Sequence, residues 1–161
     1  MRDQRVKQLA LGGLLASLVL LATWLLKVPG VIGYIHLGDG VIFLSAMLMG
    51  SYAALIAGVG SALADLLAGF QQYIAATFLI KAVMALLVAW LARSGRQTRN
   101  LLVFLAAELI MVVGYFLFEA TFITTWEAAI GNIPLNLLQG AAGVVLGMVF
   151  SLYLPQLKKK I

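Results

Sequence analysis

Residues 40–69 read GVIFLSAMLMGSYAALIAGVGSALADLLAG, and this stretch decides how often the chain crosses a membrane. Its only charged side chain is Asp65, so lipid can solvate nearly all of it. A bilayer core about 30 Å thick needs about 20 helical residues for one crossing. The stretch is therefore either one very long helix or two short helices that are broken near Gly50 and Ser51.

The whole chain has the same apolar character. Of its 161 residues, 63% are hydrophobic and 11% are charged, and the mean hydropathy is +1.06. Soluble domains are about 45–50% apolar and about 25% charged, so this composition indicates an integral membrane protein. The length allows about six crossings with short loops, which predicts a single membrane domain over residues 1–161. The chain has no cysteine, which excludes disulfides and thiolate metal sites.

Outside residues 40–69, four apolar runs each predict one crossing: residues 8–26, 74–92, 101–124 and 133–154. The first run is too long for the apolar region of a signal peptide, so we expect a retained helix. Asn132 is the expected N-cap of the last helix, and Pro134 would then lie in its first turn, where proline is tolerated.

The positive charges decide between the two interpretations of residues 40–69. They form three clusters: Arg2, Arg5 and Lys7; Arg93, Arg96 and Arg99; Lys158, Lys159 and Lys160. Lysine and arginine near helix ends collect on the cytoplasmic side. Two short helices, at 40–50 and 52–69, put all nine charges on one side, whereas one long helix splits them three against six. We therefore predict an all-α, six-transmembrane-helix bundle in the cell membrane of a bacterium, with both termini cytoplasmic.

Ionisable side chains inside the predicted helices mark candidate functional positions, because each costs about 2.5–3.5 kcal/mol at a helix centre. Asp65, Lys81 and Glu119 lie roughly 6, 10 and 8 Å below the outer ends of their helices, at a rise of about 1.5 Å per residue. Asn136 and Gln139 share one face of the last helix at a similar depth. The outer half of the bundle is therefore expected to hold a polar cluster.

The first outer loop, residues 27–39, contains glycines and a proline that favour turns, and it is long enough to fold over this cluster. Aromatic side chains near the outer ends are expected to stack on a bound ring. The pattern predicts a pocket for a small water-soluble molecule. The predicted substrate-binding residues are Lys81, Glu119, Asn136, Gln139, Tyr115, Trp126, Asp65, His36 and Asp39.

Each of these residues also has an interpretation that needs no ligand. Lys81 and Glu119 can neutralise each other as a structural pair, and Asp65 can be a helix-end residue that reaches the interface. His36 and Asp39 can be ordinary solvated loop residues. Tyr115 and Trp126 can be aromatic residues that face lipid or the membrane interface. Glu108, which lies towards the cytoplasmic side, is expected to be structural or to contact another subunit.

The inner half of the first helix has two small-xxx-small spacings, Gly12 to Ala16 and Gly13 to Ser17. Such spacings let another helix approach closely. They predict either docking of a partner membrane subunit or close packing within the chain.

Several classes of function are disfavoured by what the sequence lacks. It has no P-loop, no dinucleotide-binding fingerprint and no zinc-protease or serine-hydrolase motif. His36 is its only histidine. We therefore expect neither an enzyme nor a bound cofactor or metal, and the placement of positive charges at helix ends argues against nucleic acid as a partner.

Four blocks of sequence follow one another in a familiar order: YIHLGDGVIFL (34–44), GVGSALADL (58–66), ATFLIK (76–81) and IPLNLLQG (133–140). With these blocks the chain resembles the substrate-binding S components of energy-coupling factor (ECF) vitamin transporters. The resemblance implies a six-helix fold whose outward-facing pocket is capped by the first outer loop.

The resemblance also implies partners. In this family a small-residue motif on the first helix, usually alanines four apart, docks on a transmembrane coupling subunit that works with two ATPases on separate chains. The S component is thought to topple in the membrane and carry its vitamin inwards. Here glycine replaces one alanine of the motif, which preserves the close packing.

The chain looks most like the branch that handles pyridoxine-type (vitamin B6) or hydroxymethylpyrimidine substrates, and riboflavin or another vitamin is the alternative. A stand-alone proton-coupled carrier that uses Asp65, Glu108 and Glu119 is a hypothesis of another class. A membrane subunit that transports nothing is a third.

Overall fold

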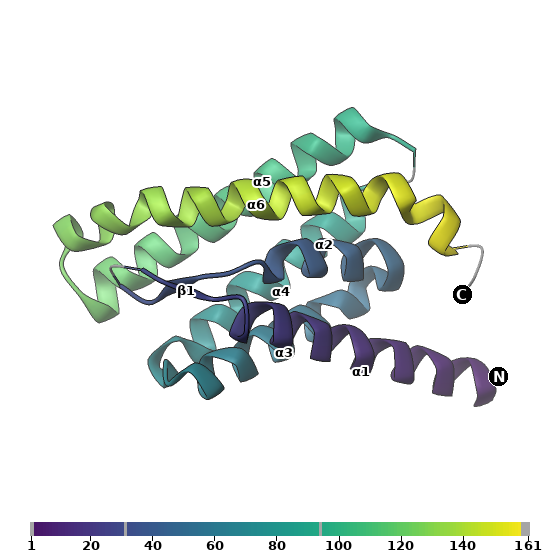
Figure 1. The fold of residues 1–161 in the computed structure, drawn as a ribbon, viewed down its shortest axis with the longest axis horizontal. Helices are drawn as coiled ribbons and strands as arrows, with labels where there is room; N and C mark the ends of the chain where they lie inside the picture. Colours follow the sequence, from purple (N-terminus) through teal and green to yellow (C-terminus); the bar gives the residue numbers. More distant parts are fainter. Residues whose placement is uncertain (1, 31, 94, 159–161) are drawn as a thin grey trace.

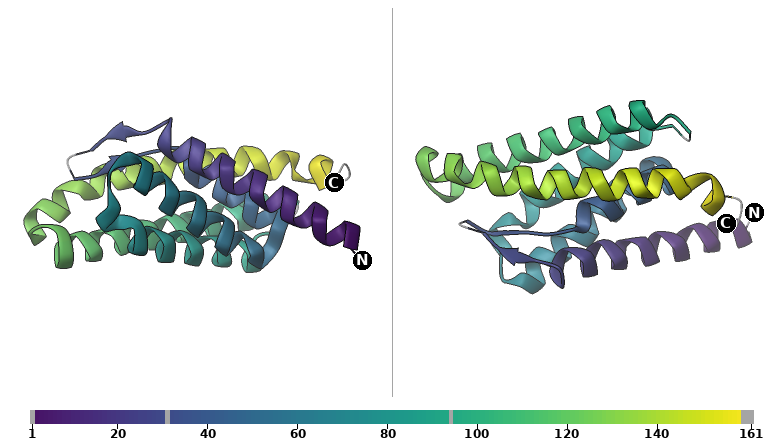
Figure 2. Two further views of the ribbon diagram at one scale, coloured as in Figure 1. Left: turned by 90° about the horizontal axis from the view of Figure 1, so that it is seen from below. Right: turned by 45° about the horizontal axis from the view of Figure 1, so that its top comes forward.

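A computed structural model describes residues 2–30, 32–93 and 95–158. The elements are α1 (Arg2–Trp24), β1 (Val28–Pro29), β2 (Tyr34–Ile35), α2 (Gly38–Met49), the 3₁₀ turn η1 (Gly50–Tyr52), α3 (Ala53–Ala68), η2 (Gln71–Tyr73), α4 (Ile74–Leu91), α5 (Gln97–Phe118), the π-helical turn η3 (Glu119–Ile123) and α6 (Trp126–Lys158). Figures 1 and 2 show an elongated bundle whose helices run roughly along its long axis. The all-α membrane class predicted from composition is confirmed.

The predicted break near Gly50 and Ser51 is present, and the chain reverses there. Gly50 ends α2 with φ of +58°, a left-handed conformation that favours glycine. The directions of α2 and α3 relative to α1 follow from the residues of α1 that each of them contacts. Along α2, Gly38 lies beside Thr23 and Met49 beside Gly12, so these two helices are antiparallel. Along α3, Ile56 lies beside Gly12 and Gly60 beside Ala16, so α3 runs parallel to α1.

Five helical segments of the described chain are long and apolar enough to cross a bilayer. One of them, Gly38–Ala68, comprises α2, η1 and α3 taken together, and it is the segment that folds back on itself. Large apolar side chains are exposed on the outside of the bundle, among them Leu9, Leu79 and Val145. Such a surface needs lipid around it.

The two ends of the bundle differ in charge and in structure. The start of α1, the α4–α5 connection and the end of α6 lie at one end, and the β1–β2 hairpin lies at the other (Figure 1). The basic clusters found in the sequence belong to the first end, although Lys159 and Lys160 lie outside the described residues. The arrangement agrees with the charge segregation from which the topology was predicted.

The last helix begins earlier than we expected. The prediction started this helix at residue 133 with Asn132 as its N-cap, but α6 starts at Trp126 and contains Pro134 in its interior. Thr125 forms the N-terminal turn, because its hydroxyl accepts a hydrogen bond from the Ala128 N–H at 3.4 Å. The Asn132 side chain instead makes tertiary hydrogen bonds, which take precedence over its local capping preference.

The first outer loop is more regular than predicted. Its strands pair antiparallel, with Val28 opposite Ile35 and Pro29 opposite Tyr34. The turn is closed by a hydrogen bond of 3.0 Å from the Gly30 N–H to the Gly33 carbonyl. Asp39, which we had assigned to this loop, belongs instead to the first turn of α2 and is completely buried.

The membrane-facing helices are held together by close contacts at glycine. At Gly147 of α6 an added Cβ would lie 2.7 Å from a ring carbon of Phe43 and 3.1 Å from one of Phe104. These two rings, from α2 and α5, stack with centroids 4.7 Å apart and are completely buried. The contact fixes α2, α5 and α6 below the polar residues that the hairpin covers.

Candidate functional site

A small cavity with about 30 Å³ of free interior lies under the hairpin. This is room for about one or two water molecules, so the polar lining, and not the volume, marks it as a candidate site. Its walls come from the hairpin, α3, α4, α5 with η3, and α6. The lining residues are Ile32, Gly33, Tyr34, His36, Asp65, Phe70, Tyr73, Thr77, Tyr115, Glu119, Asn132, Asn136 and Gln139.

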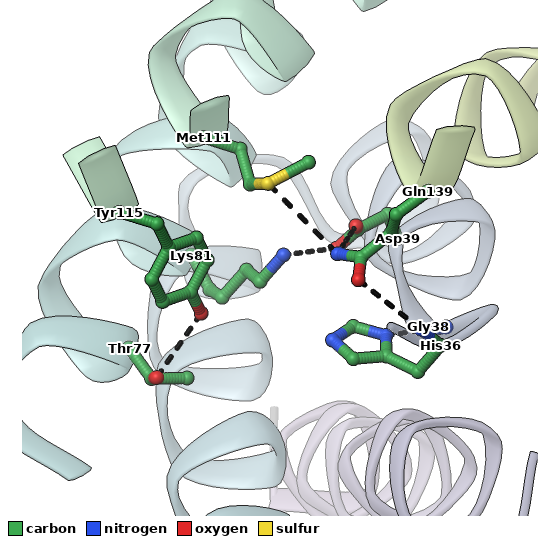
Figure 3. A network of polar contacts seen from close by, with 8 residues as sticks. All are labelled: His36, Gly38, Asp39, Thr77, Lys81, Met111, Tyr115 and Gln139. Atoms are coloured by element: carbon green, nitrogen blue, oxygen red, sulfur yellow. Dashed lines mark hydrogen bonds and ion pairs between the residues drawn. The ribbon is translucent and has the colours of Figure 1, made fainter. Parts of the chain in front are cut away.

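An ion pair supports the floor of this cavity (Figure 3). The Lys81 ammonium lies 2.5 Å from Asp39 Oδ1, and both side chains are completely buried. The Gln139 amide donates a hydrogen bond of 2.7 Å to the other Asp39 oxygen. The alternative interpretation, in which Lys81 and Glu119 neutralise each other as a structural pair, is wrong, because the charge of Lys81 is neutralised by Asp39 from a different helix.

His36 is buried at the junction between the hairpin and α2. Its Nδ1 accepts a hydrogen bond of 3.1 Å from the Gly38 N–H, and its own N–H donates to Gln139 Oε1 at 3.1 Å. Burial lowers the pKa of His36 to about 4; the nearby Asp39 opposes this shift and Lys81 adds to it. The imidazole is therefore neutral near pH 7, and the solvated-loop interpretation of His36 is wrong.

Glu119 lies in the π-helical turn that follows α5, where the Thr124 N–H reaches back to its carbonyl at 2.8 Å. Its two carboxylate oxygens each accept a hydrogen bond of 3.0 Å from the Asn132 amide, and the Tyr73 hydroxyl donates to one of them at 3.3 Å. Asn132 also donates to the Ile32 carbonyl at 3.1 Å. This carboxylate therefore links η3, α6 and the hairpin on one wall of the cavity.

Asp65 lies near the C-terminal end of α3, on a different element from Glu119. The Tyr34 hydroxyl donates a hydrogen bond of 2.6 Å to its Oδ1, so the hairpin is tied down at this point. Burial and the neighbouring carboxylate both raise the pKa of Tyr34. Within the described part of the chain, Asp65 Oδ2 and Asn136 Nδ2 are buried with no hydrogen-bond partner, and both residues line the cavity.

The aromatic residues divide into two groups. The Tyr115 hydroxyl donates to Thr77 at 3.0 Å, its ring lies 5.5 Å from the Lys81 ammonium, and it lines the cavity. The structure does not bring Trp126 there. Trp126 is 54% exposed and packs edge-on against Phe116, so its predicted stacking role is wrong and an interfacial position fits it.

Glu108 is buried outside the cavity lining. It packs against Gly140 and Gly143 of α6, and its two carboxyl oxygens have no hydrogen-bond partner among the described residues. Gly143 also lies beside Asp39, so the two carboxyl side chains are close neighbours. The expected structural position of Glu108 within the bundle agrees with this burial.

The two small-residue pairs of α1 face different surroundings. Gly12 and Ala16 face α3, where they contact Ile56 and Gly60. Gly13 and Ser17 are exposed, and no side chain lies within 4 Å of the Gly13 position. The first pair therefore serves packing within the chain, and the second leaves a surface that a further helix can approach.

The sequence prediction missed several residues of the lining, and two of them, Thr77 and Asn132, are informative. Thr77 lies one turn before Lys81 and was not singled out, although both are polar positions of one apolar helix. Asn132 was assigned to a cap, although an amide flanked by apolar residues is a candidate partner for a buried carboxylate. Lys81 and Asp39, which we predicted to bind the substrate, do not line the cavity and instead form a buried ion pair.

A helical bundle with an apolar outer surface, and with a cavity lined by buried polar side chains at one end, has the features of a membrane component that handles a small molecule. The model of the family described as "ECF-type riboflavin transporter, S component" matches residues 3–156. The chain therefore belongs to the S-component family of ECF-type transporters.

Two relatives extend the comparison. The "Thiamine precursor transporter HmpT" of Lactococcus lactis subsp. cremoris (strain MG1363) is 32% identical over 155 residues, which are 94% of this chain and 89% of that protein. An "Uncharacterized protein in gap 3'region" of Pyrococcus woesei is 30% identical over 124 residues, which are 76% of this chain and 82% of that protein. Family and relatives make this chain an integral membrane component of vitamin or precursor uptake, not an enzyme.

Proposed function

We propose that this chain is the substrate-binding subunit of an ECF-type importer and captures a thiamine precursor of the hydroxymethylpyrimidine type from outside the cell. The observation that carries the proposal is the cavity under the hairpin, where polar atoms of Asp65 and Asn136 have no hydrogen-bond partner in the described part of the chain. Buried polar groups are nearly always hydrogen-bonded, so a guest that satisfies them is favoured. The similarity to a thiamine precursor transporter supports the choice of substrate.

The choice of vitamin rests on the relative and on the polar lining, because the free interior of about 30 Å³ is smaller than any candidate ring. A small site with both hydrogen-bond donors and acceptors suits a single hydroxylated ring better than the bulky riboflavin. Pyridoxine is a ring of similar size and is the runner-up substrate. Chemical discrimination between these two rings therefore has to come from the polar side chains.

The proposed topology has six crossings, with both termini in the cytoplasm. Parallel packing of α3 on α1, and the gathering of basic clusters at one end of the bundle, support it. The hairpin and the cavity then face the outside, where the substrate enters. In this arrangement α2 is a short crossing, and its residues from Asp39 onward are largely buried by neighbouring helices.

Uptake would be driven by ATP hydrolysis on separate subunits. We propose that the exposed pair Gly13 and Ser17, together with the groove between α1 and α3, docks on a transmembrane coupling subunit. That groove is lined mainly by apolar and small residues, including Leu9, Leu55 and Val59. A smooth apolar face of this kind suits helix–helix contact inside a membrane.

The test is equilibrium binding by the purified full-length chain in lipid nanodiscs. Isothermal titration calorimetry with hydroxymethylpyrimidine, pyridoxine, thiamine and riboflavin should give the highest affinity for hydroxymethylpyrimidine. Glu119→Gln should weaken that binding because it removes charge from the cavity wall, while the matched change Glu127→Gln, on the exposed start of α6, should not. If none of the four compounds binds, the proposal is wrong.

A stand-alone proton-coupled carrier is less well supported. Such a carrier needs its acidic groups along one path, but Glu108 does not line the cavity that holds Asp65 and Glu119. Reconstitution of the chain alone in vesicles with a pH gradient distinguishes the two functions. Substrate accumulation without any ATPase would favour the carrier.

A further inference from the structure

We propose that the cavity selects a neutral or cationic ring carrying an amino or equivalent N–H donor, and that it rejects phosphorylated and carboxylated forms of the same ring. This inference rests on the proposed function and adds the charge and hydrogen-bond pattern of the substrate. It is carried by two independent features: the charges that line the cavity and the polar atoms left without partners.

The charged groups that line the cavity are both acidic. Asp65 and Glu119 are the ionisable carboxyl groups of its wall, and neither lysine nor arginine is among its lining residues. In a site of low dielectric, a fixed carboxylate repels an incoming anion strongly. A phosphate ester or a carboxylate on the ligand would therefore face repulsion with no opposing charge in the wall.

The cations near the cavity do not change this conclusion. Lys81 is bound to Asp39, and the two charges cancel below the floor. His36 is neutral near pH 7 because burial lowers its pKa to about 4. Lys27, on the hairpin side, lies 5.8 Å from the ring of Trp24 and 5.9 Å from the ring of Tyr34, and it does not line the cavity.

The unpartnered atoms give the pattern that a ligand must match. Asp65 Oδ1 accepts from the Tyr34 hydroxyl at 2.6 Å, and Oδ2 is a buried acceptor without a donor among the described residues. In the same part of the chain, Asn136 Nδ2 is a buried donor without an acceptor. Asp65 is 5% exposed and Asn136 is 6% exposed, so water from outside reaches neither of them freely.

A matching ligand therefore has a hydrogen-bond donor for Asp65 Oδ2 and an acceptor for Asn136 Nδ2. An amino group on a heteroaromatic ring supplies an N–H for Asp65, and a ring nitrogen supplies a lone pair for Asn136. An aminopyrimidine presents both groups side by side, and protonation of its ring would add a positive charge that the two carboxylates favour. A 4-oxo group in place of the amino group reverses this pattern, because the exocyclic oxygen accepts and the neighbouring ring nitrogen carries the N–H. Neither Asp65 Oδ2 nor Asn136 Nδ2 then meets its matching group.

Three matched compounds test the inference on the full-length chain in nanodiscs. They are 4-amino-5-hydroxymethyl-2-methylpyrimidine, its phosphate monoester, and the analogue in which a 4-oxo group replaces the amino group. We expect the amino compound to bind about tenfold to a hundredfold tighter than the oxo analogue, because a hydrogen bond to a charged group is lost. The phosphate ester should bind at least about a hundredfold more weakly than the parent, by repulsion from two carboxylates.

Variants separate recognition from folding. Asp65→Asn should weaken binding of the amino compound. It should also reduce the ratio between the affinities for the amino compound and for its phosphate ester, because one negative charge is removed from the cavity wall. A purely structural role of Asp65 would weaken both ligands by the same factor and would contradict the assignment. Asn136→Asp should also weaken binding of the amino compound, because the amide donor is lost. Glu127→Gln changes an exposed carboxyl group of the same helix and is the matched control.

The outcomes distinguish this inference from the proposed function. Binding of the phosphate ester within about threefold of the parent overturns the inference and leaves the proposed function intact, as does tight binding of the oxo analogue. Binding of another vitamin but not of the amino compound also overturns it. If no tested vitamin binds at all, the proposed function fails and this inference fails with it.

Discussion

Replacement of Lys81 by methionine should destabilise the protein strongly, because it removes the cation and leaves the Asp39 charge buried. Lys81 and Asp39 are both completely buried, and their atoms lie 2.5 Å apart. After the substitution, Gln139 would be the remaining side-chain donor to Asp39, at 2.7 Å. Breaking a buried ion pair in this way costs about 3–5 kcal/mol. For a protein of this size, about 2–4 °C in Tm is lost per kcal/mol, so Tm should fall by roughly 6–20 °C.

Thermal unfolding of the chain in nanodiscs, followed by circular dichroism, measures this effect. Lys27→Met removes a cation that is only partly buried on the hairpin and should change Tm by less than about 2 °C. The double variant Lys81→Met with Asp39→Asn leaves no buried charge at the pair, and it should recover a large part of the loss. A Lys81→Met variant as stable as Lys27→Met, or a double variant less stable than either single one, would refute the reasoning.

Three further predictions follow from other parts of the bundle. Gly13→Leu should reduce uptake by the assembled transporter while leaving substrate affinity within about twofold, because open space surrounds Gly13; calorimetry and cellular uptake measure the two effects, and a parallel loss of both would contradict it. Gly147→Ala should lower the free energy of unfolding by about 1–3 kcal/mol, since its new Cβ would meet the rings of Phe43 and Phe104; denaturant titration checks this, and unchanged stability would show that the rings can move. The folded-state pKa of His36, about 4, lies below its value of 6.5 in an unfolded chain, so the unfolded state binds more protons between these values and stability falls as pH drops from 6.5 to 4. The loss should be about 3 kcal/mol, it should be absent in His36→Gln, and an equal pH profile of the two proteins would argue against it.

The sequence alone determined the class of this protein and the depth of its polar residues. Apolar runs of about 20 residues report a bilayer directly, because every buried backbone group must be paired inside its own helix. The break at Gly50 could be predicted because two short helices, and not one long helix, gather the clustered basic residues on one predicted side of the membrane. Depths of Asp65, Lys81 and Glu119 followed from the rise per residue, and Asp65 and Glu119 do line one cavity.

Only the tertiary structure decided which polar side chains form ion pairs and hydrogen bonds with one another. Sequence spacing gives the height of a side chain in the bundle, but its partner depends on how each helix is rotated and which helix it faces. That is why Lys81 pairs with Asp39, 42 residues away, and not with Glu119 as in the structural-pair interpretation. It is also why the Asn132 side chain binds the Glu119 carboxylate instead of capping a helix. The rotation of each helix about its axis is set by close packing at positions such as Gly60 and Gly147. At these positions the contacts with neighbouring helices, and not the hydrophobic pattern of one helix, determine which face points inward.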